Sequence, residues 1–191
     1  MRVVLFQFQG YSGDAAGDLF GSIEEIIGSR GDDTILGDNA GNRQFGLEGD
    51  DQIEGDTGND ELSGGEGNDR VSGQYGNDIL YGDGGQDLII GGPGADTFVY
   101  RSTTESTVAA SDTILDFNMG DVINLSLIDA NALTGGNQAF SFIGNAAFSN
   151  TAGELRFSTG VLSADTNGDG IADFAINFTS VASTQAGDFI L

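Results

Sequence analysis

Acidic side chains recur at a fixed spacing in the first half of the sequence. In steps of nine from Asp33, seven of eight positions are Asp and one is Asn: Asp33, Asn42, Asp51, Asp60, Asp69, Asp78, Asp87 and Asp96. Carboxylate and carbonyl oxygens together suit a hard cation in six-fold coordination. The sequence has no His and no Cys, which excludes imidazole and thiolate metal sites, Ser-His-Asp triads and disulfides.

Glycine and apolar residues follow the same period. Counting Gly28 as position one, Gly fills position one of eight successive repeats up to Gly91 and nearly every position four. Position eight is apolar except at Gln44. The consensus is G-x-x-G-x-D-x-U-x, with U apolar, and a repeat of fixed period is the signature of a solenoid.

Each repeat predicts a six-residue turn followed by a three-residue strand. Gly at positions one and four provides positive φ without steric cost, and Asn or Asp at positions two and five suits the same tight backbone. The central strand residue points inward. Two repeats then form one coil, which places two aliphatic ladders face to face: Ile35, Ile53, Val71 and Ile89 against Leu62, Leu80 and Phe98.

The predicted core is too thin to hold these coils together without another stabilising interaction. One buried apolar side chain per repeat does not offset the entropy lost in ordering nine residues. Stacked coils also bring acids two repeats apart into repulsion, and residues 28–96 carry 16 acidic against 3 basic side chains. About five to seven Ca²⁺ ions would nearly neutralise this stretch. Mg²⁺ needs stricter geometry, and Zn²⁺ and Cu²⁺ prefer softer ligands.

We expect each ion to lie between acids that are two repeats apart. The pair Asn42 and Asp60 is the weaker one, because Asn42 is uncharged and Ala40 and Gln44 also break the consensus. The predicted ligands are the acids together with oxygens of the turns: Ser29, Gly31, Asp33, Asp38, Ala40, Asn42, Gly46, Glu48, Gly49, Asp51, Gly55, Asp56, Thr57, Gly58, Asp60, Gly64, Gly65, Glu66, Gly67, Asp69, Gly73, Gln74, Tyr75, Gly76, Asp78, Gly82, Gly84, Gly85, Asp87, Gly91, Pro93 and Asp96.

The nonapeptide resembles the calcium-binding RTX repeat. Segments 97–100, 106–117 and 120–126 resemble the C-terminal domain of the serralysin family of secreted bacterial metalloproteases, and this resemblance covers most of residues 22–191. Repeats and resemblance together predict an all-β fold: a lead-in strand or cap over 1–27, a right-handed parallel β-roll over 28–99, and a mostly antiparallel β cap over 100–191.

The resemblance also implies ligands outside the repeats. Glu24, in a [ST]-x-E lead-in, would cap the first coil, and Glu105, Asp112 and Asp121 would serve a last calcium site. The alternatives are a surface Glu on an edge strand and acids that cap turns.

Beyond residue 126 we expect strands over 139–143, 154–158 and 174–179. Residues 165–173 begin like an EF-hand loop, but position twelve is Ile176 where that loop has Glu, so an Asn-Gly/Asp-Gly hairpin turn is the preferred interpretation. The last four residues, 188–191, resemble the uncleaved type I secretion signal of serralysin-like proteins. An ordinary terminal strand is the alternative.

These features predict a non-catalytic folding and secretion module of a larger secreted bacterial protein. It would stay unfolded where calcium is scarce, pass through a type I secretion apparatus, and fold on extracellular Ca²⁺. The net charge of −24 disfavours nucleic acid and anionic membrane surfaces. No apolar run reaches transmembrane length, and the N-terminus lacks a secretory signal peptide.

A second hypothesis is binding of an alginate-like polysaccharide, because similar rolls accompany mannuronan epimerases and lyases. Arg43, Arg70, Phe45 and Tyr81 are the candidate contacts, although we expect them on different edges with no continuous row. Catalysis by carboxylates alone, as in glycosidases, is a third class. No acidic pair stands outside the calcium spacing, so we do not expect an enzyme.

Overall fold

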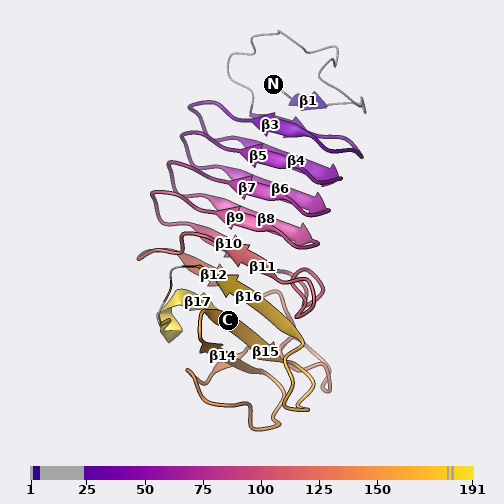
Figure 1. Cartoon of the computed structure of the whole chain (residues 1–191), viewed down its shortest axis with the longest axis vertical. Coiled ribbons are helices and arrows are strands. Elements are labelled where there is room, and N and C mark those ends of the chain that lie inside the picture. The colour runs from indigo at the N-terminus through magenta and orange to yellow at the C-terminus, as the bar shows by residue number, and fades with distance from the viewer. Residues whose placement is uncertain (1, 5–23, 180, 182) are drawn as a thin grey trace.

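The computed structural model describes residues 2–4, 24–179, 181 and 183–191. It is all-β, and within these residues the single helical segment is the 3-10 turn η1, Ala186–Asp188. No helix in this part of the chain is long and apolar enough to cross a membrane. Short strands stack along the long axis, and the C-terminal strands β14 to β17 lie at one end of the stack (Figure 1). The predicted β-roll with a β cap is confirmed.

One sheet carries eight strands, all parallel, in the order β1-β2-β4-β6-β8-β10-β12-β17. Its strands are β1 Arg2–Val4, β2 Glu25–Ile27, β4 Arg43–Glu48, β6 Glu61–Glu66, β8 Ile79–Gly84, β10 Thr97–Val99, β12 Val122–Asn124 and β17 Phe189–Ile190.

The other sheet carries nine strands in the order β13-β14-β15-β16-β11-β9-β7-β5-β3. These are β3 Thr34–Leu36, β5 Gln52–Glu54, β7 Arg70–Ser72, β9 Leu88–Ile90, β11 Asp112–Ile114, β13 Ser141–Phe142, β14 Glu154–Ser158, β15 Val161–Asp165 and β16 Phe174–Phe178. The chain alternates between the two sheets at every repeat, as a two-repeat coil requires.

The aliphatic ladders lie where the period predicts. Ile35, Ile53, Val71 and Ile89 are in register through β3, β5, β7 and β9, and Ile114 continues the row. Leu62, Leu80 and Phe98 form the facing row, which Ile123 continues. Each of these side chains is at most 2% exposed. Gln44 occupies the same row and is fully buried.

Three strands of the first sheet are longer than the predicted three residues. β4, β6 and β8 have six residues each, because pairing continues past the position-one glycine into the turn, where Leu47 pairs with Gly65 and Gly65 with Asp83.

The C-terminal region closes the end of both sheets. β14, β15 and β16 form an antiparallel meander, and β16 joins β11 in parallel. β17 adds to β12 in the other sheet. Strands were expected over 139–143, 154–158 and 174–179, and β13, β14 and β16 lie there. β15 was not predicted.

Candidate metal centre

The position-six acids stack in two ladders along the turns of the roll. The backbone N–H of Asp33 donates to Oδ1 of Asp51 at 2.7 Å, and Asp51 donates in the same way to Asp69 at 2.8 Å. On the other edge, Asp60 donates to Asp78 at 2.8 Å. Each acid is thereby fixed directly above the acid 18 residues further on, as predicted. Every position-six Asp from Asp51 to Asp96 is at most 3% exposed.

The second oxygen of these carboxylates has no protein partner. Oδ2 is buried and without a hydrogen bond in seven residues: Asp51, Asp60, Asp69, Asp78, Asp87, Asp96 and Asp112. A buried carboxylate oxygen without a donor is costly in free energy. Such a row of oxygens needs either protons or cations to be tolerated.

The position-one glycines open the space that these oxygens face. A Cβ added at Gly64 would lie 2.3 Å from Oδ2 of Asp69 and 2.7 Å from the carbonyl oxygen of Gly82. A Cβ at Gly46 would lie 2.0 Å from Oδ2 of Asp51. A carboxylate oxygen and a carbonyl oxygen of the next coil therefore converge beside the inner glycines Gly46, Gly55, Gly64 and Gly73. Both are hard donors of the kind that Ca²⁺ accepts.

The expectation that position one needs positive φ is wrong. In the turns over 46–87, positive φ occurs at positions two and four: Leu47, Asp56, Gln74 and Asp83 at position two, with Gly65, and Gly49, Gly58, Gly67, Gly76 and Gly85 at position four. Position one is Gly for another reason, since a side chain there would collide with the stacked oxygens. Position five does not adopt positive φ either.

Burial dominates the electrostatics of the ladders. It raises the pKa of Asp60 to about 6, and that of five other carboxyls to about 7: Asp51, Asp69, Asp87, Asp96 and Asp112. Neighbouring acids raise each pKa further, and the backbone N–H bond lowers it. The pKa values of Asp78 and Asp121 are raised by burial as well. The folded roll thus disfavours the negative charge of its own ladders at neutral pH.

The ligand set around each space is mixed. Within the described residues, no three acidic side chains gather around one point, so an ion would take carboxylates together with backbone oxygens. The position-three carbonyls predicted as ligands already accept hydrogen bonds between turns, for example Glu66 from the N–H of Gly49 and Tyr75 from that of Gly58. The side chains of Glu48 and Glu66 are exposed, and Glu48 lies 3.5 Å from Arg30.

Both ladders continue beyond the repeats through a longer coil. The N–H of Asp87 donates to Oδ1 of Asp112, and that of Asp96 to Oδ1 of Asp121, both at 2.9 Å and across 25 residues. Glu105 does not join a ladder. It accepts the N–H of Arg101 at 2.8 Å and pairs with its guanidinium. Oδ2 of Asp121 accepts the N–H of Asn118, which is the turn-capping alternative.

Ser106 and Tyr100 complete the end of one ladder, and the sequence did not reveal them. The N–H of Asp112 donates to the buried Ser106 hydroxyl at 2.9 Å, where every earlier coil offers a carboxylate. The Tyr100 hydroxyl is buried beside Asp112 and has no partner in hydrogen-bond geometry. Tyr100 stands at position one, where the eight earlier repeats have Gly, and Ser106 lies in the longer loop that follows, so the consensus gives no signal for either residue.

Two other features were singled out in the sequence: Glu24 in the lead-in and the segment 165–173. Glu24 is exposed, and its carbonyl oxygen accepts the N–H of Arg43 at 2.8 Å; Ser22, the other half of its motif, lies outside the described residues. Residues 166–173 connect the antiparallel strands β15 and β16, which confirms the hairpin. Asp165 accepts the N–H groups of Asn167, Gly168 and Gly170.

Strands β4 and β8 of one sheet carry three of the four proposed polysaccharide contacts, which were expected on different edges. Phe45 and Tyr81 are in register through Ser63 on one sheet, and the Arg43 guanidinium lies 5.3 Å from the centre of the Phe45 ring. Arg70 lies on the opposite sheet, in β7. A groove of about 750 Å³ adjoins this face, lined in part by Phe45, Ser63 and Arg101.

Comparison with known proteins identifies a family and solved structures that are similar to this chain. The family model described as "Peptidase M10 serralysin C terminal" matches residues 10–191. The R3 subunit of AlgE6, a mannuronan C5-epimerase of Azotobacter vinelandii, shares 25% identity over 85% of this chain and 80% of its own, with a TM-score of 0.50. The R2 subunit shares the fold at 24% identity over 87% and 92%, with a TM-score of 0.51. No curated protein matches the sequence.

Proposed function

The chain belongs to the serralysin C-terminal family of M10 peptidases, and from this premise we propose that it is a folding and secretion module switched by calcium. The match concerns the C-terminal repeat part of that family and not its catalytic part. The chain is a calcium-binding repeat module of RTX type. The proposal adds that Ca²⁺ decides whether the roll folds.

The row of seven partnerless Asp oxygens carries this proposal. A cation held beside the position-one glycines would satisfy these oxygens and offset the repulsion between stacked acids. Ca²⁺ would be bound by the position-six acids from Asp51 onward and by nearby turn carbonyls. Its chemistry there is charge neutralisation and crosslinking of successive coils. Without it, burial of the ladders opposes folding.

The position of the C-terminus supports an order of events in which export precedes folding. The tail that resembles a secretion signal forms β17, and Phe189 is 8% exposed in the folded roll. β17 pairs with β12 of the roll, so a transporter would reach this tail only while the roll is unfolded. We therefore place type I export before calcium-driven folding, with the folded protein outside the cell.

A calcium titration in far-UV circular dichroism tests the switch. Starting from EDTA at neutral pH, Ca²⁺ is expected to restore β structure cooperatively, whereas Mg²⁺ at the same concentration is not. Full β structure in excess EDTA would disprove the switch. Export is tested separately: a passenger fused ahead of residues 1–191 is expected in the medium of cells that have a type I transporter, and inside cells that lack it.

Binding of an acidic polysaccharide is the second candidate. It is favoured by two cation–aromatic pairs on one face, with Arg43 over Phe45 at 5.3 Å and Arg101 over Tyr81 at 4.9 Å, next to the groove. Titration calorimetry with alginate in saturating Ca²⁺ would show heat that the double variant Arg43→Ala/Arg101→Ala loses. Equal heats for both proteins, or none, would remove this function.

A further inference from the structure

The first turn on each edge of the roll differs from the five turns that follow between Gly46 and Asp87. In the turns from Gly46 to Asp87, positions two and four both have positive φ, as at Leu47 (89°) and Gly49 (117°). In the turns over 28–33 and 37–42, neither position two nor position four has positive φ. The same repeat therefore adopts two backbone forms.

The altered backbone changes what the acid contacts. In the first turn the N–H of Ser29 donates to Oδ2 of Asp33 at 2.6 Å, and the Ser29 hydroxyl donates to the same oxygen at 3.0 Å. In the second, the N–H of Asp38 donates to Oδ1 of Asn42 at 2.8 Å. The corresponding oxygen has no partner in the inner turns. In the first coil, it is bonded to the chain itself.

Gln44 adds a donor to the second of these turns. It is fully buried in the aliphatic ladder, in register between Ile26 and Leu62, where a polar side chain is costly. Its Nε2 donates to the carbonyl oxygen of Glu54 at 3.3 Å.

The Gln44 amide reaches the space beside Gly37. In the inner turns, the equivalent space beside the position-one glycine is lined by oxygens. A Cβ at Gly37 would lie 2.7 Å from Nε2 of Gln44, 2.4 Å from Oδ1 of Asn42 and 2.2 Å from the carbonyl oxygen of Gly55. An N–H donor, like a cation, places positive charge beside these oxygens. It also repels a cation from the same place. Asn42 also removes the charge that a cation would neutralise.

We propose that the first coil, residues 28–45, closes its turns with its own hydrogen-bond donors in place of calcium, so that calcium binding begins at the turn that starts with Gly46. The inference rests on the proposed calcium function of the inner turns. It assigns the predicted ligands Ser29, Asp33, Asp38 and Asn42 to a metal-free end of the roll, where Gln44 and the uncharged Asn42 together exclude the ion from the second turn.

Counting bound calcium by native mass spectrometry on the whole chain tests this proposal. Asp33→Asn and Gln44→Leu are expected to keep the wild-type number of ions, whereas the matched control Asp69→Asn in an inner turn loses at least one. The triple variant Ala40→Gly/Asn42→Asp/Gln44→Leu, which restores the consensus, is expected to gain one ion.

The outcomes separate the two claims. Loss of an ion in Asp33→Asn or Gln44→Leu would overturn the metal-free coil, and so would a triple variant that folds without gaining an ion. An unchanged count in Asp69→Asn, or a wild type that binds no calcium, would instead overturn calcium binding by the inner ladders, and the inference would fall with it.

Discussion

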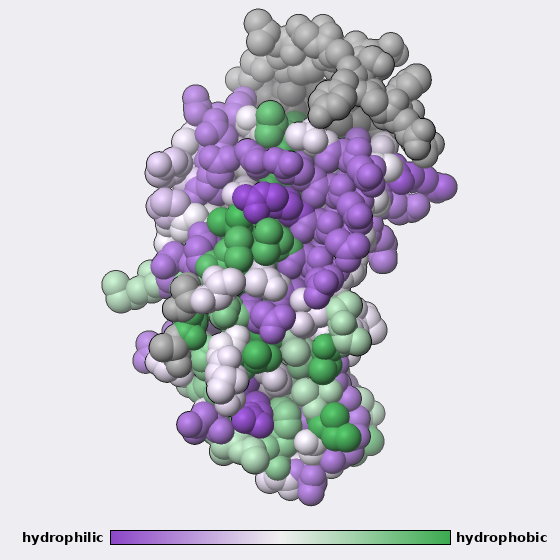
Figure 2. Space-filling view, in the orientation of Figure 1, coloured by the Kyte–Doolittle hydropathy of each residue, from purple (hydrophilic) through white to green (hydrophobic). Residues whose placement is uncertain are grey.

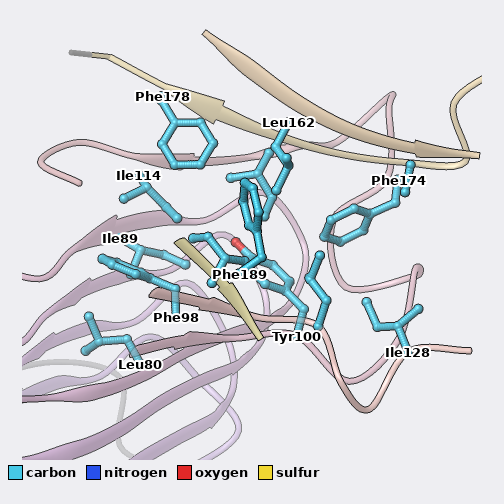
Figure 3. Packing of buried hydrophobic residues seen from close by; sticks show 14 of the residues in the cluster. Leu80, Ile89, Phe98, Tyr100, Ile114, Ile128, Leu162, Phe174, Phe178 and Phe189 are labelled. Atoms are coloured by element: carbon cyan, nitrogen blue, oxygen red, sulfur yellow. The ribbon is translucent and has the colours of Figure 1, made fainter. Parts of the chain in front are cut away.

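The roll and the C-terminal region hold themselves together by different means. In the roll, each repeat buries one ladder side chain, which is aliphatic in all repeats except those of Gln44 and Phe98, and the turns bury carboxylate oxygens that lack partners. In the C-terminal region, aromatic rings pack in contact: Tyr100 with Phe174 at 5.3 Å between ring centres, and Phe157 with Phe178 at 5.6 Å. Figure 3 shows Tyr100, Phe174 and Phe178 in one buried cluster with the last residues of the aliphatic ladders.

The surfaces differ in the same way. Hydrophilic residues cover most of the visible face of the roll, whereas the C-terminal end mixes hydrophilic and hydrophobic residues (Figure 2). A structure stabilised by apolar burial depends little on solutes, but a structure stabilised by bound cations forms only where the cation is present. One chain thus combines a region that responds to calcium with a region whose apolar core does not depend on a bound cation.

Proton concentration should give the largest effect, because it acts on many ladder acids together. Burial raises the pKa of Asp51, Asp69 and Asp87 to about 7 in the folded roll, against an ordinary Asp value of 3.8. The folded state then holds protons more tightly than the unfolded state. Stability without calcium is therefore greatest below about pH 4 and falls as the pH rises to about 7.

Circular dichroism in EDTA checks this sign. We expect β structure at about pH 4.5 and its loss by about pH 8, whereas saturating Ca²⁺ at pH 8 restores it. A calcium-free chain that gains β structure as the pH rises would show that the ladder acids are not buried as described.

The aromatic core gives the next largest effect. Phe174 is fully buried, so Phe174→Ala should lower the free energy of unfolding by about 3–5 kcal/mol even in saturating calcium. Urea denaturation measures it, with Ile171→Ala as the control because Ile171 is 68% exposed. A loss that added calcium could fully reverse would contradict an independent core.

Two glycine-to-alanine substitutions compare an inner turn of the roll with the first coil. Gly64→Ala places a methyl group 2.3 Å from Oδ2 of Asp69 and should cost about 1–3 kcal/mol and weaken calcium binding. Gly31→Ala in the first coil meets nothing within 4 Å and has no positive φ, so it should be neutral or stabilise by up to about 1 kcal/mol. Thermal unfolding in calcium compares them, and equal losses would mean that the space beside position one has no special role.

The smallest effect belongs to the aliphatic ladder. Ile53 is fully buried, and Ile53→Val should cost about 0.5–1.5 kcal/mol in saturating calcium. Urea denaturation measures the change. A much larger loss would indicate that the thin core, and not the turns, holds the coils together.

The repeat itself made much of the roll predictable. A nine-residue period with one inward side chain determines the ladders of Ile53 and Leu62, and the stacking of Asp51 on Asp33 follows from two repeats per coil. The site could be predicted to the level of which acids stack, because that depends only on the period.

Other features depend on contacts that the period does not encode. Leu47 adopts positive φ at position two although Gly is the residue that favours it, because its coil must match its neighbours. Ser106 comes from the longer loop after the last repeat, and Tyr100 replaces the consensus Gly at position one. The period gives no signal for β15 either, because residues 161–165 lie outside the repeats.

Hydrogen exchange followed by mass spectrometry, at neutral pH with Ca²⁺ or with EDTA, measures separately how far each region depends on calcium. Amides of β5 to β10 are expected to be protected in calcium and to exchange rapidly in EDTA, while amides of β14 to β16 keep much of their protection. Equal protection of the roll in both conditions would contradict the claim that calcium, and not its own core, holds the roll together.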